Sequence, residues 1–139
     1  MNVKYILLIA LTAIALGCKN NNNTNPTLPG NTYTGHLVAD EKNDDFKTGP
    51  ITIPVSVTFN GNNYQSTLLA ASPFAAGAKG SFKLTGNIIS LADSTVHPAN
   101  FDWNLILSGH YSYKLKGDSL TMIRMAGNNT YSYKLKKAN

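Results

Sequence analysis

One six-residue phrase occurs twice near the end of this 139-residue chain, and its internal alternation constrains the fold more than any other feature. Tyr-Ser-Tyr-Lys-Leu-Lys stands at residues 111–116 and again at residues 131–136. In both copies Tyr and Leu fall on one parity, and Ser and Lys on the other. Successive side chains of a β-strand point to opposite faces, so each copy predicts a strand with one buried and one solvated face.

Similar alternation, punctuated by glycine-containing turns, extends over most of the chain. Asn60-Gly61, for example, is a strong signal for a tight hairpin. About nine strands are expected, at residues 32–39, 51–59, 62–71, 80–85, 88–92, 103–108, 111–116, 120–125 and 130–136.

This pattern predicts an all-β fold, an antiparallel up-and-down meander of about 8–9 strands closed into a barrel, with a β-sandwich as the alternative. A closed and wholly antiparallel barrel needs an even number of strands. Either one segment is not part of the ladder, or the last strand lies outside the closure, or the sheet is a sandwich.

The connections between the expected strands differ in length in a regular order. Long connections at residues 40–50, 72–79 and 93–102 alternate with tight turns at residues 60–61 and 86–87. Alternate connections of an antiparallel meander lie at the same end. We therefore expect the three long loops to surround one end of the barrel and tight turns to close the other.

The N-terminal residues predict export and a lipid anchor. Lys4 precedes an apolar run at residues 5–16, which has the length of a secretory signal and is too short to span a membrane. The run ends in Ala15-Leu16-Gly17-Cys18, which resembles the lipobox of bacterial lipoproteins. The resemblance implies that residues 1–17 are a signal peptide, and that Cys18 is acylated and anchors the protein to a membrane. Cys18 is the only cysteine, which excludes an intramolecular disulfide.

Residues 18–29 predict a flexible tether between this anchor and a domain at residues 30–139. The stretch is rich in Asn and almost free of apolar side chains, so it cannot form a core. Lys19-Asn20 is not the aspartate signal that retains lipoproteins in the inner membrane, so the lipoprotein resemblance implies the outer membrane. The absence of an acidic run favours its periplasmic leaflet over the cell surface.

A second resemblance concerns the domain itself. Lipocalins carry a Gly-x-Trp motif near the first strand and, on a late strand, an arginine packed over that tryptophan. This chain has Gly30-Asn31-Thr32-Tyr33 and Arg124 in comparable places, with Tyr for Trp and a different spacing. The phrases at residues 107–111 and 115–120 are also similar to those of small bacterial lipocalin-like lipoproteins. The resemblance implies a lipocalin-like barrel with a ligand mouth framed by the longer loops.

Inward-facing aromatic side chains are the candidate ligand-lining residues. The parity of the repeated phrase places its tyrosines on the core side, and a nearby arginine suits a carboxylate. The candidate set is Trp103, Tyr111, Tyr113, Arg124, Tyr131 and Tyr133. Two interpretations remain open: the rings fill a solid barrel, or they line a cavity for a small apolar or amphipathic ligand.

The sequence contains no recognisable catalytic or metal-binding pattern. His36, His97 and His110 lack metal-site spacing, and the acidic residues at 40–45 lack the glycine turn of a calcium loop. Neither a nucleophile motif nor a carboxylate pair indicates an enzyme. We expect no catalytic residues, no metal and no cofactor.

The charge pattern excludes a further class of partner. The net charge is +5, yet Arg124 is the only arginine and the lysines are spread along strands, which argues against nucleic-acid binding. Two hypotheses follow. The protein is either a membrane-anchored module that binds a small hydrophobic ligand, or a solid barrel that acts as a structural or protein-interaction module of the cell envelope.

Overall fold

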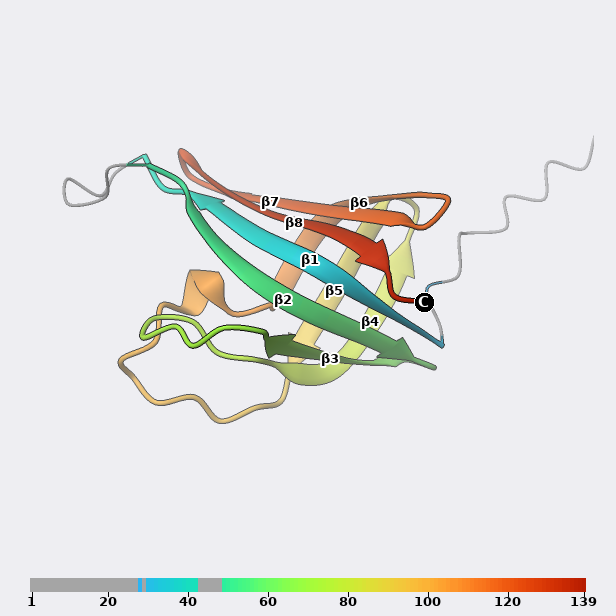
Figure 1. The fold of residues 1–139 in the computed structure, drawn as a ribbon, viewed down its shortest axis with the longest axis horizontal. Helices are drawn as coiled ribbons and strands as arrows, with labels where there is room; N and C mark the ends of the chain where they lie inside the picture. The colour runs from blue at the N-terminus through green and yellow to red at the C-terminus, as the bar shows by residue number, and fades with distance from the viewer. Residues whose placement is uncertain (1–27, 29, 43–48) are drawn as a thin grey trace, which may run out of the picture.

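Eight antiparallel strands form a closed barrel (Figure 1) in the computed structural model, which describes residues 28, 30–42 and 49–139. Each strand pairs with its neighbours in sequence, and the first also pairs with the last. The predicted antiparallel up-and-down barrel is confirmed, and the sandwich alternative is wrong. The strands are β1 (Asn31–Asp40), β2 (Ile51–Asn60), β3 (Asn63–Leu68), β4 (Lys79–Thr85), β5 (Ile88–Asp93), β6 (Gly109–Lys116), β7 (Ser119–Ala126) and β8 (Asn129–Lys137).

The sixth of the nine predicted strands, at residues 103–108, is wrong. It begins with a short 3-10 helix, η1 (Trp103–Leu105), capped by the Asp102 carboxylate, which accepts a hydrogen bond of 2.9 Å from the Asn104 amide. The sequence pattern also predicts a glycine-containing turn at Gly109-His110, between this segment and the next predicted strand, and this turn is wrong because β6 begins at Gly109. With eight strands every neighbouring pair, including β1 and β8, is antiparallel.

Four two-residue turns share one chemistry. In each, glycine comes first with φ between 55° and 61°, and Asn or Asp comes second. Positive φ at the first residue alone is the requirement of a type II′ turn, which glycine meets without steric cost. The hairpin predicted at Asn60-Gly61 therefore exists, with its turn one residue later than predicted, because Asn60 pairs with Asn63. The turns are Gly61-Asn62, Gly86-Asn87, Gly117-Asp118 and Gly127-Asn128.

The connections divide the barrel into two unlike ends (Figure 1). The prediction that the three long loops share one end is confirmed: they lie at residues 41–50, 69–78 and 94–108, and we call this the loop end. The opposite, tight-turn end carries the turns at Gly61-Asn62, Gly86-Asn87 and Gly117-Asp118 and the C-terminus, whereas the turn at Gly127-Asn128 lies at the loop end. The described chain also enters at the tight-turn end, where the Gly30 amide donates to the Phe59 carbonyl oxygen at 2.8 Å.

The inward faces of the strands form one core. Tyr113 and Tyr133 are 7% and 2% exposed, while Lys114 and Lys134 are exposed, which confirms the predicted register of the repeated phrase. Leu28 lies within the predicted tether but is fully buried, so the packed part of the chain includes it. The predicted signal peptide, Cys18 and the rest of the tether lie outside the described residues.

A substitution at Gly35 tests the β1–β8 seam. Gly35 pairs with Val55 on one side and Leu135 on the other, and a Cβ there would overlap the carbonyl oxygen of Lys134. We expect Gly35→Ala to lower the free energy of unfolding by about 1–3 kcal/mol in urea denaturation, as overpacking does elsewhere. His36→Ala, an exposed change on the same strand, is the control. Equal urea midpoints for the two variants would contradict the close approach of β1 and β8.

Candidate functional site

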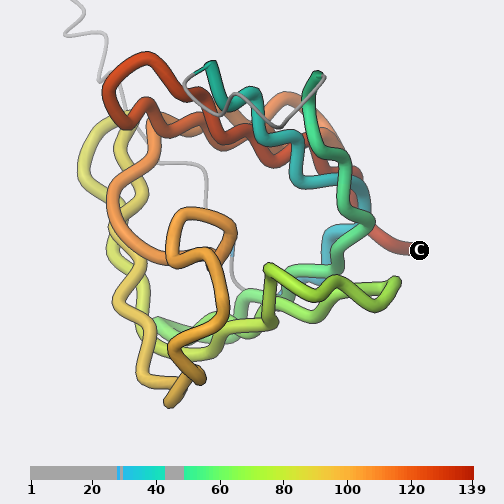
Figure 2. Tube along the Cα trace, turned by 90° about the vertical axis from the view of Figure 1, so that its left-hand side faces the viewer, coloured from blue at the N-terminus to red at the C-terminus, as the bar shows by residue number. Residues whose placement is uncertain are grey.

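The chain between β5 and β6 closes the loop end of the barrel. Leu105, Ile106 and Leu107 are each 1% exposed and belong to the core cluster. Figure 2 looks onto this end and shows the segment, in orange, lying across the opening. The Tyr64 hydroxyl donates to the Leu107 carbonyl oxygen at 2.6 Å. We call residues 103–108 the plug, because they replace the expected open mouth with packed apolar side chains.

Arg124, on β7, holds the plug in place through hydrogen bonds. Its guanidinium donates to the carbonyl oxygens of Asn104, at 2.8 Å, and Ser108, at 3.3 Å. The same group lies over two aromatic rings, 4.9 Å from the centroid of Tyr131 and 5.4 Å from that of Tyr111. Within the described ranges Arg124 has no ion pair with a carboxylate. Carbonyl oxygens and ring faces therefore stabilise this charge.

The structure brings the four predicted tyrosines together inside the barrel. Tyr111, Tyr131 and Tyr133 are among its largest fully buried side chains, and the rings of Tyr111 and Tyr133 meet edge to face at 5.8 Å. Such packing fills the interior around them and favours the solid barrel over an open cup. Trp103 lies apart from these interior rings, because it is 59% exposed on η1, where its ring packs against that of His97.

Polar atoms remain among these rings. The hydroxyls of Tyr111 and Tyr113 and the Nε of Arg124 are buried and have no hydrogen-bond partner within the described part of the chain. Burial raises the pKa of Tyr111 to about 12, although the Arg124 guanidinium lowers it in part. Burial also raises the pKa of Tyr133 well above its ordinary value. The hydroxyls therefore stay protonated at neutral pH and keep the ability to donate.

A buried His–Asp pair, which the sequence analysis missed, fixes the start of the loop that leads to the plug. The His97 Nε2 and the Asp93 Oδ2 lie 2.6 Å apart, with side chains 2% and 9% exposed. Asp93 Oδ1 also accepts from the Thr95 amide at 3.0 Å. Burial alone raises the pKa of Asp93, but the hydrogen bonds from Thr95 and His97 outweigh it and hold the pKa below its ordinary value of 3.8.

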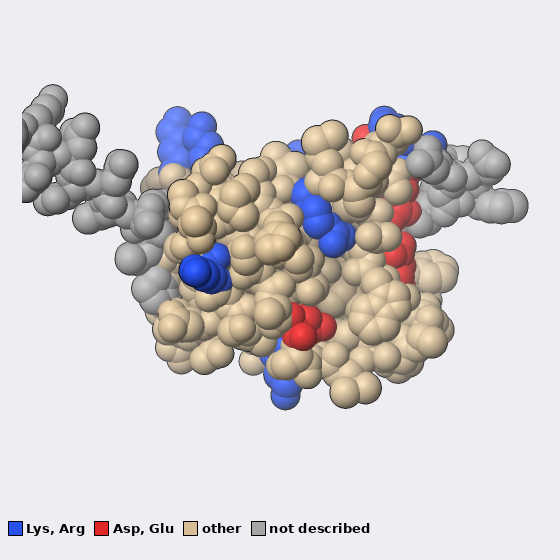
Figure 3. Space-filling view, turned by 180° about the vertical axis from the view of Figure 1, so that it is seen from behind, with Lys and Arg blue, Asp and Glu red and all other residues tan. Residues whose placement is uncertain are grey.

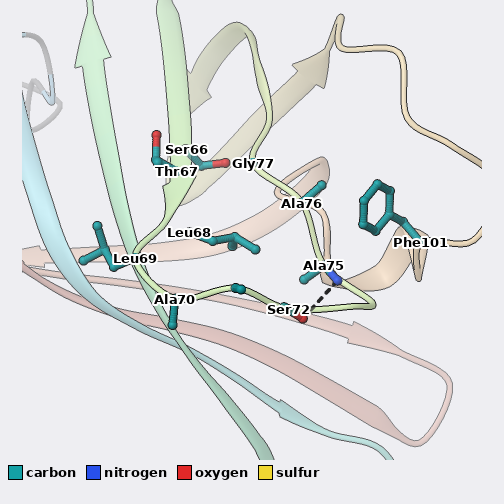
Figure 4. A pocket seen from close by; sticks show the side chains of 11 residues that line it. Ser66, Thr67, Leu68, Leu69, Ala70, Ser72, Ala75, Ala76, Gly77 and Phe101 are labelled. Carbon is teal, nitrogen blue, oxygen red and sulfur yellow. Dashed lines mark hydrogen bonds between the residues drawn. The ribbon is translucent and has the colours of Figure 1, made fainter.

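An open apolar cleft lies beside the plug and was also not predicted. Its volume is about 550 Å³, and it lies between the end of β3, the loop at residues 69–78 and Phe101 from the other long loop (Figure 4). The loop is held in shape by the Ser72 Oγ, which accepts from the Ala75 amide at 3.2 Å. We call this open apolar cleft the mouth cleft. Its apolar lining consists of Leu68, Leu69, Ala70, Ala71, Ala75, Ala76 and Phe101.

The mouth cleft, the plug and the Asp93–His97 pair were not predicted, and they differ in the sequence signals that they carry. The small residues of the loop at 69–78 were visible, but nothing in them shows that Phe101 lies opposite. The unbroken apolar triplet at residues 105–107 interrupts the period of two, and this break was the available sign of the plug. The spacing of Asp93 and His97 carries no signal by itself, because many loops contain such a pair.

No family model, curated protein or solved structure matches this chain. The described residues contain no cluster of three or more His, Cys, Asp or Glu that would suit a metal ion. They also contain no helix with the length and apolarity to cross a membrane. Lipidation at Cys18 stays a prediction, because that residue lies outside the described ranges. Function must therefore be argued from the barrel's own geometry.

Truncation of one interior ring measures how completely the barrel is filled. Because Tyr133 is buried against Tyr111, we expect Tyr133→Ala to lower the free energy of unfolding by about 3–5 kcal/mol, the usual cost of removing a buried aromatic side chain. Tyr133→Phe keeps the ring and serves as the control. Urea denaturation followed by circular dichroism gives both values. A loss for Tyr133→Ala well below this range would mean that water occupies the site of the ring.

The Asp93–His97 pair predicts a specific acid response. The folded-state pKa of Asp93 is lowered, so the carboxylate's contribution to stability is present above its ordinary value of 3.8 and is lost as pH falls through the folded pKa. We expect the stability difference between wild type and Asp93→Asn to shrink from about pH 5 to about pH 2. Asp118→Asn, an exposed change, is the control. A pH-independent difference in urea unfolding would refute the role of this pair.

Proposed function

We propose that this protein is a membrane-anchored lipoprotein whose lipocalin-like barrel binds a small apolar or amphipathic ligand in the mouth cleft. The lipobox-like sequence ending in Cys18 supports the anchor, and with it an outer-membrane location facing the periplasm. The closed meander barrel with its long loops at one end supports the lipocalin-like classification. We propose that the protein binds a ligand and is not an enzyme.

The site proposed for the ligand is the rim of the barrel and not its centre. Tyr111, Tyr131 and Tyr133 occupy the interior, and the plug covers them at the loop end. The mouth cleft, in contrast, is open to solvent and has a volume of about 550 Å³, within the range of about 300–1,000 Å³ typical of small-molecule sites. Its lining is mostly apolar, which suits an acyl chain or another apolar group.

The observation that carries the proposal is the set of exposed apolar side chains on the two loops that contribute to this cleft. Leu69 and Phe74, on one long loop, are each 57% exposed, and Val96 and Trp103, on another, are 94% and 59% exposed. Large apolar side chains that gather in the open commonly mark a binding surface. Here they are carried by the two loops that flank the cleft.

An amphipathic ligand also has a candidate partner for an acidic head group. The Arg124 guanidinium has no carboxylate partner within the described residues, and its Nε is unpaired. Its other nitrogens hold the plug, so a head group would reach it by displacing the plug carbonyl oxygens of Asn104 or Ser108. Binding of this kind would loosen the plug, whereas a purely apolar ligand would leave it in place.

The solid-barrel hypothesis remains the second candidate, because a specific observation favours it. The interior rings and the plug leave the tyrosines fully buried, as in a structural module. In that case the exposed apolar side chains of the loop end would contact another protein of the cell envelope. The two functions differ in the expected partner and share the same surface.

A charge placed in the mouth cleft separates the two functions. We expect a chain starting at residue 19 to bind a fluorescent fatty-acid analogue saturably, and Ala76→Glu, in the cleft lining, to weaken binding at least about tenfold, since a tenfold loss corresponds to about 1.4 kcal/mol. Ala126→Glu, an exposed change at the end of β7, is the matched control. Fluorescence titration measures both dissociation constants, and urea unfolding confirms that both variants fold.

Absence of saturable binding by the wild-type chain would refute the ligand-binding function and leave the structural module. Equal affinities for Ala76→Glu and Ala126→Glu would keep ligand binding but exclude the mouth cleft as its site.

A further inference from the structure

The repeated phrase builds a cationic face on the outside of the barrel. The strand β7 lies between its two copies and aligns them residue by residue: Lys114 pairs with Thr121, which pairs with Lys134. One step along the strands, Lys116 pairs with Ser119, which pairs with Lys136. All four lysines are exposed and point outward near the tight-turn end. We call Lys114, Lys116, Lys134 and Lys136 the lysine patch.

The spacing of the patch suits a surface with many separate anions. Neighbouring strands lie about 4.8 Å apart, so lysines on β6 and β8 are about 10 Å apart across β7, while those on one strand are about 7 Å apart. Small hydroxyl residues, Ser119 and Thr121, fill the middle. Four flexible cations spread over this area can contact several head groups that lie in one plane.

Charge is distributed unevenly between the two ends of the barrel. Among described residues the acidic side chains of the loop end are Asp40, Glu41, Asp93 and Asp102, whereas the tight-turn end has only Asp118. On the face in Figure 3 most acidic side chains lie toward the right, the loop end, whereas Lys and Arg side chains are scattered over the face, with one group at the upper left, at the tight-turn end. Neither ion pair found in the described ranges involves the lysine patch. Asp118, in the turn next to Lys116, is the one described carboxylate near these four lysines, so the patch keeps a net positive charge.

The point where the chain enters the barrel lies at the same end as the patch. Leu28 is buried in the core, and Gly30 is bonded to Phe59 at the end of β2, opposite the long loops. The segment that carries Cys18 continues from here. A lipid on Cys18 would hold the tight-turn end close to the membrane. Electrostatic attraction acts over about 8–10 Å at physiological salt, so this proximity matters for the patch.

We propose that the lysine patch binds anionic lipid head groups of the membrane that carries the anchor. This inference rests on the lipid anchor of the proposed function. Basic residues next to an anionic membrane surface each contribute appreciably to binding, and four of them together can orient a small domain. The outer face of β6, β7 and β8 then lies against the bilayer. The mouth cleft, which adjoins β3 across the eight-stranded barrel from β7, faces away from the bilayer and is open to ligands or partners.

The test measures lysine protection on the full-length lipidated protein. The protein is reconstituted into vesicles of phosphatidylcholine alone, or with about one third phosphatidylglycerol, an anionic lipid. A membrane-impermeant amine reagent labels exposed lysines, and mass spectrometry gives the rate at each position. We expect labelling of the four patch lysines to slow at least about threefold in anionic vesicles, and this protection to disappear in high salt. Lys42, Lys79 and Lys83, away from the patch, should label equally in both vesicles.

Charge-neutral variants provide the matched control. In the variant with all four patch lysines changed to Gln, the nearby Lys137 should lose its protection in anionic vesicles. In a variant with Lys42, Lys79 and Lys83 changed to Gln, Lys137 should keep it. All seven lysines are exposed, so neither variant should change the urea unfolding midpoint.

The outcomes separate this inference from the anchor. Flotation with both vesicle types but equal labelling in both would overturn the patch and leave the anchor standing. Flotation with anionic vesicles only would support the patch and overturn the anchor. Flotation with neither would overturn both. Protection of the patch by added heparin, a free polyanion, without protection by anionic vesicles would also overturn the proposal, since it would indicate a polyanion instead of a membrane.

Discussion

Pairing of β1 with β8 is the interaction on which the rest of this structure depends. It removes the last free strand edges and turns a meander into a closed barrel. Gly35 lies at this seam, where the backbone of β8 approaches too closely for a side chain. Closure also encloses the inward face of every strand, so the large rings of Tyr111, Tyr131 and Tyr133 are buried together in the interior. An interior occupied in this way leaves the two ends and the outer face as the surfaces available for function.

The two ends of the barrel differ in the residues they expose. The loop end combines the plug, the mouth cleft and exposed apolar side chains such as Phe74 and Trp103. The tight-turn end combines the point of chain entry with the lysine patch. Attachment at one end and recognition at the other would keep the ligand surface clear of the bilayer. This division follows from the strand order, because an even-stranded meander returns both termini to the same end.

Features that depend on local pattern were predictable from the sequence, and features that depend on tertiary contact were not. The parity of the repeated phrase placed its tyrosines inward and its lysines outward, and the order of short and long connections placed the loops at one end. The plug was misinterpreted as a strand because Trp103, Leu105 and Leu107 alternate with their neighbours. Only tertiary contacts, such as the hydrogen bonds from Arg124 to Asn104 and from Tyr64 to Leu107, explain why this segment folds over the barrel. The mouth cleft likewise joins residues from separate segments of the chain. The Asp93–His97 pair could not be predicted because its strength depends on burial.

The central claim is that the barrel is filled and that ligand recognition occurs at its loop end. Amide hydrogen exchange of the intact protein, with and without a saturating fluorescent fatty-acid analogue, tests it most directly. The account predicts slower exchange with the probe in the loop at residues 69–78 and around Phe101. The strands β6 and β8, which carry the buried tyrosines, should exchange at unchanged rates. Slower exchange in β6 and β8 with unchanged loops would place the ligand among the tyrosines and contradict the claim.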